Sequence, residues 1–333
     1  MILADFRWVG PHGIGRLASE ILSHFPDLVP LDDTLSPVNP LDALWSSLQI
    51  MRHRPRPKLY FTPGYTPPLW SNVPFIFTVC DLNHLDISQN SSIWKRLYYQ
   101  IVMRPACHRA AFVLTISEFS RNRILDWTGL SPDRVVNISE GVDQRFQPDG
   151  PWHDPGYQYF LYIGNHKPHK NIPRLIEAFA RSNLHPEIKL ILSGQAEPQL
   201  ERMIHFWRVE NSVIFAGIID EKNLPALYRG ALGFVFPSLY EGFGLPPLEA
   251  MACGVPVITS NTTSLPEVVG DSALLVNPLD VDELALALQH LASDENLRCA
   301  LREKGLERAK LFSWERTISI TRKTILSVLG EKK

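Results

Sequence analysis

The stretch 231–259 constrains the fold of this chain more than any other segment. It contains two short apolar runs, 231–236 and 255–258, with a glycine-containing turn and a helical segment between them. Two continuous apolar runs joined through a helix are typical of parallel strands that are buried on both faces of a sheet. Pro246 and Pro247 fit the first turn of the helix, where the missing N–H of proline costs no hydrogen bond. The stretch therefore predicts a strand, a turn, a helix and a second, parallel strand.

The turn before this helix has the features of an anion site. The amides of Phe243, Gly244 and Leu245 would point away from the helix at the positive end of its dipole. Glu241 stands in the turn and Glu249 lies about one turn inside the helix, so both carboxylates can face the same ligand. A carboxylate beside a phosphate site is repulsive unless it accepts hydroxyl protons, which favours a ligand with hydroxyls on both sides of a phosphate. The alternative is a strand–turn–helix corner with solvated glutamates, because short glycine motifs often occur without a ligand.

Length and composition indicate an ordinary globular protein with room for two domains. The chain has 333 residues, 45% apolar and 20% charged, and a net charge of −2. This charge gives no support for a nucleic-acid partner. The four cysteines are scattered without the spacing of metal ligands, so we expect free thiols and no metal site. No signal peptide or apolar run of membrane-spanning length is recognised, which predicts a cytoplasmic protein.

Apolar runs alternate with helical patterns along both halves of the chain. This alternation predicts an α/β fold with parallel sheets that are covered on both faces. The first half has expected strands at 2–6, 59–61, 74–79, 112–116 and 135–138, and the second half has them at 159–163, 189–192, 213–215, 231–236, 255–258 and 273–276.

The string PSLYEGFGLPPLEAMACGVPVIT, residues 237–259, resembles the signature of retaining glycosyltransferases of the GT-B family 4. The resemblance spans the whole chain and is strongest over 159–310. In that family two glutamates flank the nucleotide-sugar. The resemblance implies that Glu241 contacts the donor sugar, that Glu249 contacts the ribose hydroxyls, and that the amides of 243–245 hold the diphosphate.

The resemblance also implies the GT-B architecture, in which two Rossmann-like parallel-sheet domains face a cleft. Residues 1–147 would form an N-terminal acceptor-binding domain, and 157–312 a C-terminal nucleotide-sugar-binding domain. Residues 313–333 would form a helix that returns to the N-terminal domain. Prolines and glycines in 147–156 predict the linker.

The segment GNHKPHKN, 164–171, follows an expected strand and precedes an expected helix. The family places basic residues here to clamp the leaving diphosphate. Lys170 matches the lysine, His169 stands where arginine is common, and Gly164 opens the donor-binding loop. A lysine just before a helix is unfavourable against the helix dipole, so an anion explains Lys170 better than helix stability does.

A second glycine segment, GPHGIGR at 10–16, follows the first expected strand. Open parallel sheets bind ligands outside the carboxyl ends of their strands, which is where this loop would lie. Gly13, Gly15 and Arg16 match a family loop that closes over the donor phosphates and the acceptor. The alternative is a tight turn with a surface arginine.

Two positions depart from the family pattern. Cys80 stands where the family has a histidine that meets the donor sugar, although Asp81 fits the rest of the motif. A cysteine neither carries a positive charge nor donates strongly, and His84 is a weak candidate to substitute. Glu140 replaces the asparagine of a second family segment, SEGVD at 139–143.

Two further segments leave alternatives open. The basic run MRHRPRPK, 51–58, is best interpreted as a solvated face, with contact to an anionic membrane surface or a lipid diphosphate acceptor as the alternative. The segment 93–102 has one apolar face at helical spacing, for which a core helix is the default and a membrane-contacting helix the alternative. That face consists of Ile93, Trp94, Leu97, Tyr98, Ile101 and Val102.

The expected activity is a retaining transfer of a hexose from a nucleotide diphosphate sugar to a saccharide or lipid-linked saccharide acceptor in polysaccharide biosynthesis. By resemblance we expect UDP-glucose ahead of GDP-mannose, with no cofactor and no metal. Lys170 and the amides of 243–245 would stabilise the departing diphosphate. A non-catalytic nucleotide-sugar-binding subunit and a nucleotide-sugar epimerase are the alternatives. A cytoplasmic location with peripheral contact to the inner membrane surface agrees with a lipid-linked acceptor.

Overall fold

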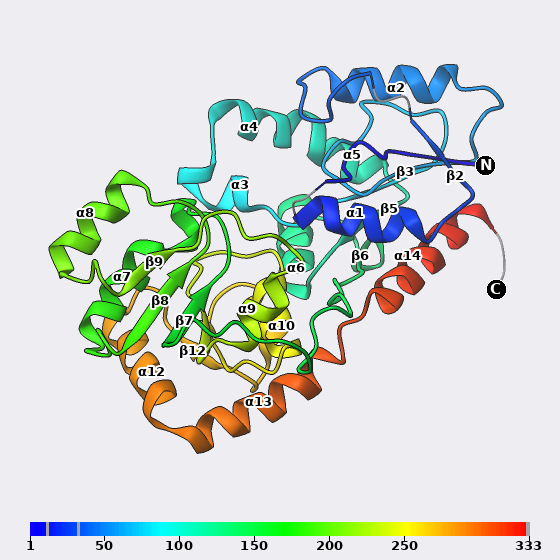
Figure 1. Ribbon diagram of the computed structural model, residues 1–333. Helices are drawn as coiled ribbons and strands as arrows, with labels where there is room; N and C mark the ends of the chain where they lie inside the picture. The colour runs from blue at the N-terminus through cyan, green and yellow to red at the C-terminus, as the bar shows by residue number, and fades with distance from the viewer. Residues whose placement is uncertain (11–12, 32–33, 331–333) are drawn as a thin grey trace. The chain divides into compact units, whose positions relative to one another are not determined.

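The structure is a computed structural model that describes residues 1–10, 13–31 and 34–330. The chain forms two compact units (Figure 1). The first unit contains Met1–Gly141 and Trp314–Lys333, and the second contains Val142–Ser313. The last helix, α14 (Trp314–Leu329), therefore belongs to the first unit.

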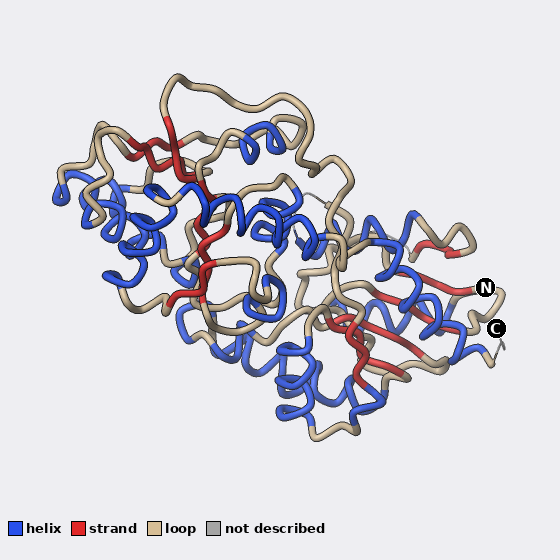
Figure 2. Tube along the Cα trace, turned by 90° about the horizontal axis from the view of Figure 1, so that it is seen from below, coloured by secondary structure: helices blue, strands red, loops and turns tan. Residues whose placement is uncertain are grey.

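The first unit is built on a six-stranded parallel sheet in the order β2-β1-β3-β4-β5-β6. Figure 2 shows these strands side by side near the N-terminus, with helices on either side of them. Strand β4 is buried along its whole length, and three of its four residues are apolar, because both faces of the sheet are covered. The strands are β1 (Ile2–Ala4), β2 (Leu28–Pro30), β3 (Leu59–Thr62), β4 (Phe75–Thr78), β5 (Phe112–Thr115) and β6 (Val135–Asn137).

Short helices connect the strands of the first unit. The clearest N-cap is Ser117, whose side chain accepts the N–H of Ser120 at the start of α6. The helices are α1 (Gly13–Ser23), α2 (Asp42–Arg52), α3 (Asn83–Asp86), α4 (Ile93–Tyr98), α5 (Arg104–Arg109), α6 (Glu118–Thr128) and α14, with single turns η1 (Ser88–Asn90) and η3 (Pro132–Arg134) and a π-helical segment η2 (Tyr99–Met103).

The second unit has its own six-stranded parallel sheet, in the order β12-β11-β10-β7-β8-β9. Phe234 of β10 pairs in parallel with Val257 of β11, which confirms the arrangement predicted for 231–259. The strands are β7 (Gln158–Tyr162), β8 (Ile188–Leu192), β9 (Val213–Phe215), β10 (Gly233–Phe236), β11 (Val257–Ser260) and β12 (Leu274–Val276). The helices are η4 (Pro168–Lys170), α7 (Ile172–Arg181), α8 (Pro198–Trp207), α9 (Leu224–Arg229), α10 (Leu245–Ala252), α11 (Leu265–Val269), α12 (Val281–Ser293) and α13 (Glu295–Ala309).

The boundary between the units differs from the predicted one. It falls between Gly141 and Val142, so the expected linker 147–156 is part of the second unit. The N–H of His153 donates to the carbonyl of Ala226 at 2.9 Å. Arg229 donates to carbonyl oxygens of Pro151 at 2.8 Å and of Gln147 at 3.1 Å. These bonds tie a proline-rich segment to α9, which composition alone does not reveal.

The segment 93–102 also differs from its default interpretation as a core helix. All six residues of α4 are described, and none of them is buried. Tyr98 is partly buried against the core, and fully buried side chains begin with Tyr99 and Met103, in the π-helical segment. The core-helix interpretation is therefore wrong for the first half of this segment.

A buried ionic cluster connects β1 to α2 in the first unit. The guanidinium of Arg7 makes a two-bond contact with Asp5, at 2.8 and 2.7 Å, and a single bond to Asp42 at 2.6 Å. It also donates to the carbonyl of Leu35 at 2.7 Å. The three charged side chains are 0–4% exposed. Two carboxylates and one guanidinium thus form a cluster with an excess of negative charge, and Arg7 holds the loop before α2 against the end of β1.

The excess charge predicts a pH dependence of stability. Burial raises the pKa of Asp42 from 3.8 to about 6, against the opposing effect of Arg7. The folded state therefore binds this proton more tightly than the unfolded state, and the resulting stabilisation is lost as the pH rises from about 4 to 6. The Asp42→Asn variant lacks this titration. Its free energy of unfolding, relative to that of the wild type, should therefore rise by roughly 2–3 kcal/mol from pH 4 to pH 7. Urea unfolding at both pH values measures the change, and parallel curves for the two proteins would contradict it.

Candidate functional site

The candidate site lies at the switch point of the second sheet. The strand order runs outward from the neighbouring strands β7 and β10 in opposite directions, and ligands of open parallel sheets bind at the carboxyl ends of such a pair. The segment 164–171 follows β7, and the segment 237–244 follows β10. The topology therefore brings together two loops that are far apart in the sequence.

Lys170 and Glu241 form an ion pair across these two loops. Their Nζ and Oε1 atoms are 2.6 Å apart, and each side chain is 13% exposed. The ammonium also lies 5.1 Å from the centre of the Phe236 ring, at the end of β10. Two residues that the sequence analysis assigned to different ends of the donor thus contact each other directly.

Hydroxyl groups from the next loop fix the 237–244 segment. Ser264 Oγ lies 2.6 Å from the carbonyl oxygen of Phe243 and 2.9 Å from that of Glu241. The N–H of Glu241 donates to Thr263 Oγ1 at 3.2 Å. The loop is therefore held in place by the protein itself. Neither hydroxyl was recognised from the sequence, because serine and threonine are common in loops of every kind.

His169 and Asn171, at the end of the 164–171 segment, also bond to the 237–244 segment. The buried side chain of Asn171 donates to the carbonyls of Pro237 and Pro278, at 3.0 and 2.7 Å. The carbonyl of His169 accepts the N–H of Leu239 at 2.7 Å. Lys170 lies between these two anchored residues, so the position of its backbone is fixed.

Three backbone amides are available at the start of α10. Within the described residues, the N–H groups of Phe243, Gly244 and Leu245 donate to no protein acceptor. The next two residues are prolines, and the first bonded amide of the helix is that of Leu248, which donates to the carbonyl of Gly244 at 3.3 Å. Consecutive unpaired amides at the positive end of a helix can bind an anion, so the diphosphate contact of 243–245 stays a prediction that this geometry permits.

Gly244 is required for the geometry of this anion site. Its φ is +133°, and a Cβ atom there would lie 3.0 Å from Leu265 Cδ2. We expect Gly244→Ala to cost about 1–3 kcal/mol of stability and to weaken nucleotide binding, because the strained backbone would move the free amides. Gly129→Ala is the control, since Gly129 has a φ of +74° with nothing within 4 Å of its Cβ position. Urea unfolding and calorimetry with free nucleotide test both variants, and equal nucleotide affinities in the two would contradict the assignment.

Glu249 lies inside α10 and is 3% exposed. Its Oε2 atom accepts a hydrogen bond from the Tyr228 hydroxyl at 3.0 Å. Tyr228, at the end of α9, was not recognised from the sequence because nothing in its local pattern distinguishes it from a core aromatic residue. The Tyr228 hydroxyl thus orients the Glu249 carboxylate. The contact of Glu249 with a ribose remains a prediction.

Gly164 joins the loop after β7 to the loop after β8. Its N–H donates to Ser193 Oγ at 2.8 Å. A Cβ atom at this position would lie 2.5 Å from the Tyr162 hydroxyl, so no larger residue fits. His166 adds a second link, with Nε2 at 2.7 Å from the carbonyl oxygen of Ser193. His166 was also missed by the sequence reasoning, which considered only the basic residues 167–170.

The other predicted site residues lie in the first unit. Helix α1 begins at Gly13, so Gly13, Gly15 and Arg16 lie in its first turns and not in a loop as expected; the rest of that loop includes Pro11 and His12, which lie outside the described residues. Gly15 is buried where a Cβ would meet the carbonyl oxygen of Gly10 at 2.2 Å. Close packing of the chain against the helix therefore explains this glycine.

Cys80 and Asp81 follow β4 at the carboxyl edge of the first sheet. Cys80 is 5% exposed, and burial raises the pKa of its thiol well above the usual value, with a further rise from the negative charge of Glu140. The Asp81 N–H donates to the Tyr65 hydroxyl oxygen at 2.7 Å, and Asp81 Oδ1 accepts the N–H of Asn83 at 3.0 Å. Cys80 is therefore a neutral thiol, and Glu140, the second departure from the family pattern, lies in its neighbourhood.

The described residues show neither a metal centre nor a membrane-spanning helix. No group of three or more histidine, cysteine, aspartate or glutamate side chains there is arranged to hold a metal ion. None of the helices in residues 1–10, 13–31 and 34–330 has the length and apolar character needed to cross a membrane.

Comparison with known proteins decides the family. Residues 143–308, nearly the whole second unit, match the family model described as glycosyl transferases group 1. The chain belongs to the group 1 glycosyltransferases. The O-antigen chain mannosyltransferase B of Escherichia coli is 37% identical over 232 residues, which cover 66% of this chain and 61% of that protein. The MMP alpha-(1->4)-mannosyltransferase of Mycolicibacterium hassiacum is 33% identical over 228 residues, 65% of this chain and 55% of that protein. This group 1 chain thus aligns with less than two thirds of each of these relatives.

Solved structures of glycosyltransferases show that this group 1 chain has the GT-B fold. A sucrose-phosphate synthase from Thermosynechococcus elongatus superimposes with a TM-score of 0.79 at 21% identity, over 99% of both chains. HepE of Anabaena, solved in complex with UDP and glucose, has the same TM-score at 18% identity, over 98% of this chain and 99% of that one. At these identities the likeness concerns the fold alone.

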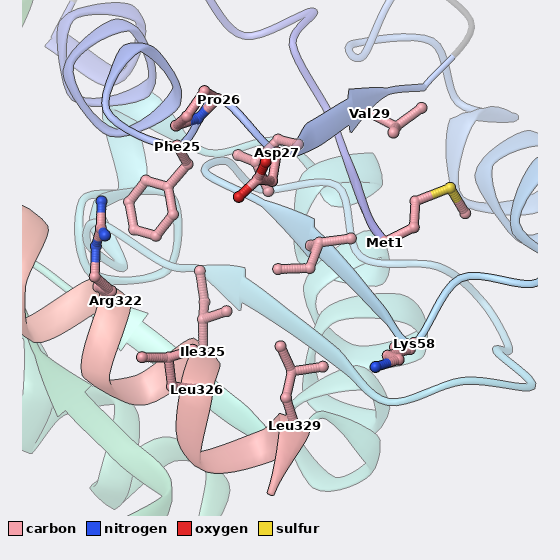
Figure 3. A pocket seen from close by; sticks show the side chains of 12 residues that line it. Met1, Phe25, Pro26, Asp27, Val29, Lys58, Arg322, Ile325, Leu326 and Leu329 are labelled. Atoms are coloured by element: carbon pink, nitrogen blue, oxygen red, sulfur yellow. The ribbon is translucent and has the colours of Figure 1, made fainter. Parts of the chain in front are cut away.

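A groove in the first unit lies away from the predicted donor residues. It has a volume of about 720 Å³ and lies at the amino ends of β1 and β2, where Met1, Ile2 and Leu28 line it. Figure 3 shows Ile325 and Leu329 of α14 on the side opposite the turn before β2. Ligands of open parallel sheets bind at the carboxyl ends of the strands, so this groove is no part of the candidate site.

Proposed function

We propose that this chain is a retaining GT-B family 4 mannosyltransferase that moves mannose from GDP-mannose to a saccharide or lipid-linked saccharide in polysaccharide assembly. The names of the relatives support mannose, and this replaces the sequence-based preference for UDP-glucose. The observation that carries the proposal is the Lys170–Glu241 pair beside the unpaired amides of 243–245. That arrangement offers an ammonium and an anion site to a diphosphate and a carboxylate to a sugar.

The proposed chemistry needs no nucleophile from the protein. The bond between sugar C1 and the diphosphate oxygen breaks while the acceptor oxygen bonds to C1 on the same face. The acceptor proton passes to the departing phosphate oxygen, and the nucleoside diphosphate leaves. Negative charge grows on the diphosphate in this step, and donors that are already in place stabilise it by several kcal/mol. Lys170 and the three amides fill that role, and Glu241 accepts a hydroxyl of the sugar once the phosphate has taken over Lys170.

The first unit is proposed to supply the acceptor side. We assign acceptor binding to the domain expected at 1–147 and nucleotide-sugar binding to 157–312, with Glu249 on the ribose. Gly13, Gly15 and Arg16 are proposed to approach the donor phosphates, and Cys80 and Asp81 the sugar. A cytoplasmic location at the inner membrane surface is part of the same proposal, because lipid-linked acceptors are held there.

The donor and the independence from metal are tested together. We expect GDP to bind the protein in excess chelator, and GDP-mannose to be slowly hydrolysed there without acceptor, because Lys170 and the amides supply the positive charge. Calorimetry with GDP and UDP, each with and without EDTA, gives the nucleotide preference. Tight binding of UDP with none of GDP would contradict the mannose donor, and loss of turnover in EDTA that returns with Mg²⁺ would contradict independence from metal.

Two alternatives remain distinguishable by product analysis. The departures at Cys80 and Glu140 favour a non-catalytic nucleotide-sugar-binding subunit, which would bind GDP but leave GDP-mannose intact. A nucleotide-sugar epimerase would convert the sugar while it is still attached to the nucleotide. NMR of the incubated donor separates intact donor, free mannose and an altered nucleotide-sugar.

A further inference from the structure

Helix α4 presents an apolar surface to solvent. Ile93, Trp94, Leu97 and Ile101 are 67%, 77%, 41% and 65% exposed. We call these four side chains the α4 face. Figure 1 shows α4 at the periphery of the first unit. Single exposed apolar side chains are common, but a contiguous set on one helix marks an interaction surface.

The other side of the same helical segment already packs into the protein. Tyr99 and Met103 are 4% and 0% exposed and belong to the core of the first unit, as do Ala106 and Cys107. The segment from α4 through α5 therefore carries apolar side chains on two sides, and only one of these sides is covered by the protein. An apolar stripe on a helix is normally buried against a partner. The fold thus supplies one partner for this segment and leaves the α4 face without one.

The charged side chains of the segment that carries the α4 face are all positive. No aspartate or glutamate occurs between Asp86 and Glu118, whereas Lys95 and Arg96 lie within α4 and Arg104 follows it, all of them exposed. Asp86 is itself paired with Arg123 at 2.5 Å. A partner that is both negatively charged and apolar is complementary to this composition, and a basic or purely polar surface is not.

We propose that the α4 face inserts into the surface of an anionic lipid bilayer. Trp94 and the aliphatic side chains would enter the boundary between headgroups and acyl chains, where tryptophan is favoured. Lys95 and Arg96 would extend their charged ends toward lipid phosphates while their stems stay in the apolar layer. A second copy of this chain fits less well, because a two-fold contact through this face would bring like charges together.

The basic run 51–58, the earlier candidate for membrane contact, is less suited to this role. The side chain of Arg54 donates to the carbonyls of Met51 and His53, and that of Arg56 to the carbonyl of Asn72. Lys95 and Arg96 make comparable local bonds, to the carbonyl of Asn90 at 3.1 Å and to Ser91 Oγ at 3.0 Å. The α4 face is therefore distinguished by its four exposed large apolar side chains, whereas the run 51–58 exposes Met51. The proposal rests on the membrane location given under the proposed function, but not on glycosyl transfer, so it is tested without any substrate.

The test is co-sedimentation with lipid vesicles. We expect the full chain to bind mixed phosphatidylcholine–phosphatidylglycerol vesicles and to bind pure phosphatidylcholine much more weakly. Ile93→Ser/Trp94→Ser should lower the partition coefficient by roughly a hundredfold, from the apolar area removed. Lys95→Gln/Arg96→Gln should lower it by roughly thirtyfold at low salt, and by less at high salt.

The control variant is Trp152→Ser/Phe206→Ser. These two side chains are 68% and 74% exposed, which matches Ile93 and Trp94, but they lie in the second unit. We expect it to bind vesicles like the wild type. Circular dichroism and light scattering of each variant report on folding and oligomeric state. Absence of vesicle binding, an equal loss in the control, or a dimer that Ile93→Ser/Trp94→Ser converts to a monomer without any vesicle binding would overturn the proposal, and GDP binding would be unaffected in every case.

Discussion

Replacing Glu241 by glutamine is expected to lower turnover by a factor of about 10² to 10³ while tightening the binding of free GDP by roughly tenfold. The two effects have opposite signs because Glu241 has two partners. In the structure its carboxylate lies 2.6 Å from the Lys170 ammonium, in a site that is only 13% exposed. A diphosphate competes with this carboxylate for the lysine, so removing the negative charge favours the nucleotide. The sugar, however, loses its acceptor for a hydroxyl proton.

Calorimetry with GDP and steady-state assays with GDP-mannose measure the two effects separately. Lys170→Met should lose both GDP affinity and turnover, since it removes the cation and leaves Glu241 near the phosphate site. Asp271→Asn is the matched control, because Asp271 forms an ion pair of 2.8 Å with Lys304 on the surface, where it is 83% exposed. Weaker GDP binding in Glu241→Gln than in the wild type would contradict the competition between carboxylate and phosphate.

Replacing Arg7 by methionine is expected to destabilise the protein by about 3–5 kcal/mol at pH 7. Arg7 is the cation between two carboxylates that are 0% and 2% exposed. Without it, Asp5 and Asp42 stay buried with unopposed negative charge, and the carbonyl of Leu35 loses its donor. The loss should be smaller at pH 4, where Asp42 is protonated in the folded state.

Urea unfolding of the Arg7→Met protein gives the free energy of unfolding directly. Arg123→Met is the control, because its pair with Asp86 involves an arginine that is 38% exposed, and such pairs contribute about 1 kcal/mol or less. A loss at Arg7 no larger than the loss at Arg123 would mean that water or a neighbouring group compensates the two carboxylates.

The loops 164–171 and 237–244 differ in how much of their structure could be predicted from the sequence. Strand, glycine turn and proline-started helix are local features, and each residue of 237–249 has its structural role within a few positions along the chain. The free amides of 243–245 could therefore be predicted from the two prolines and the glycine. The partner of Glu241 could not, because Lys170 is 71 residues away and meets it only through the adjacency of β7 and β10.

The burial of individual side chains was harder to predict from the sequence than the order of strands and helices. The periodicity of 93–102 indicated an apolar face but not whether the protein covers it. The structure exposes Ile93, Trp94, Leu97 and Ile101 of that face, whereas Tyr98 packs against the core. Likewise, the sequence analysis did not identify the cluster of Asp5, Arg7 and Asp42, since nothing local distinguishes a solvated arginine from one between two buried carboxylates. The linker 147–156 was misplaced for the same reason, as its contacts with α9 are not local.

The sequence by itself determined the alternation of strands and helices, the parallel sheets and the unpaired amides at the start of α10, because these follow from residue types within a single turn or strand. The tertiary structure alone decided which charges meet, which apolar face stays uncovered and where one unit ends, because these depend on contacts between segments that are distant in the chain.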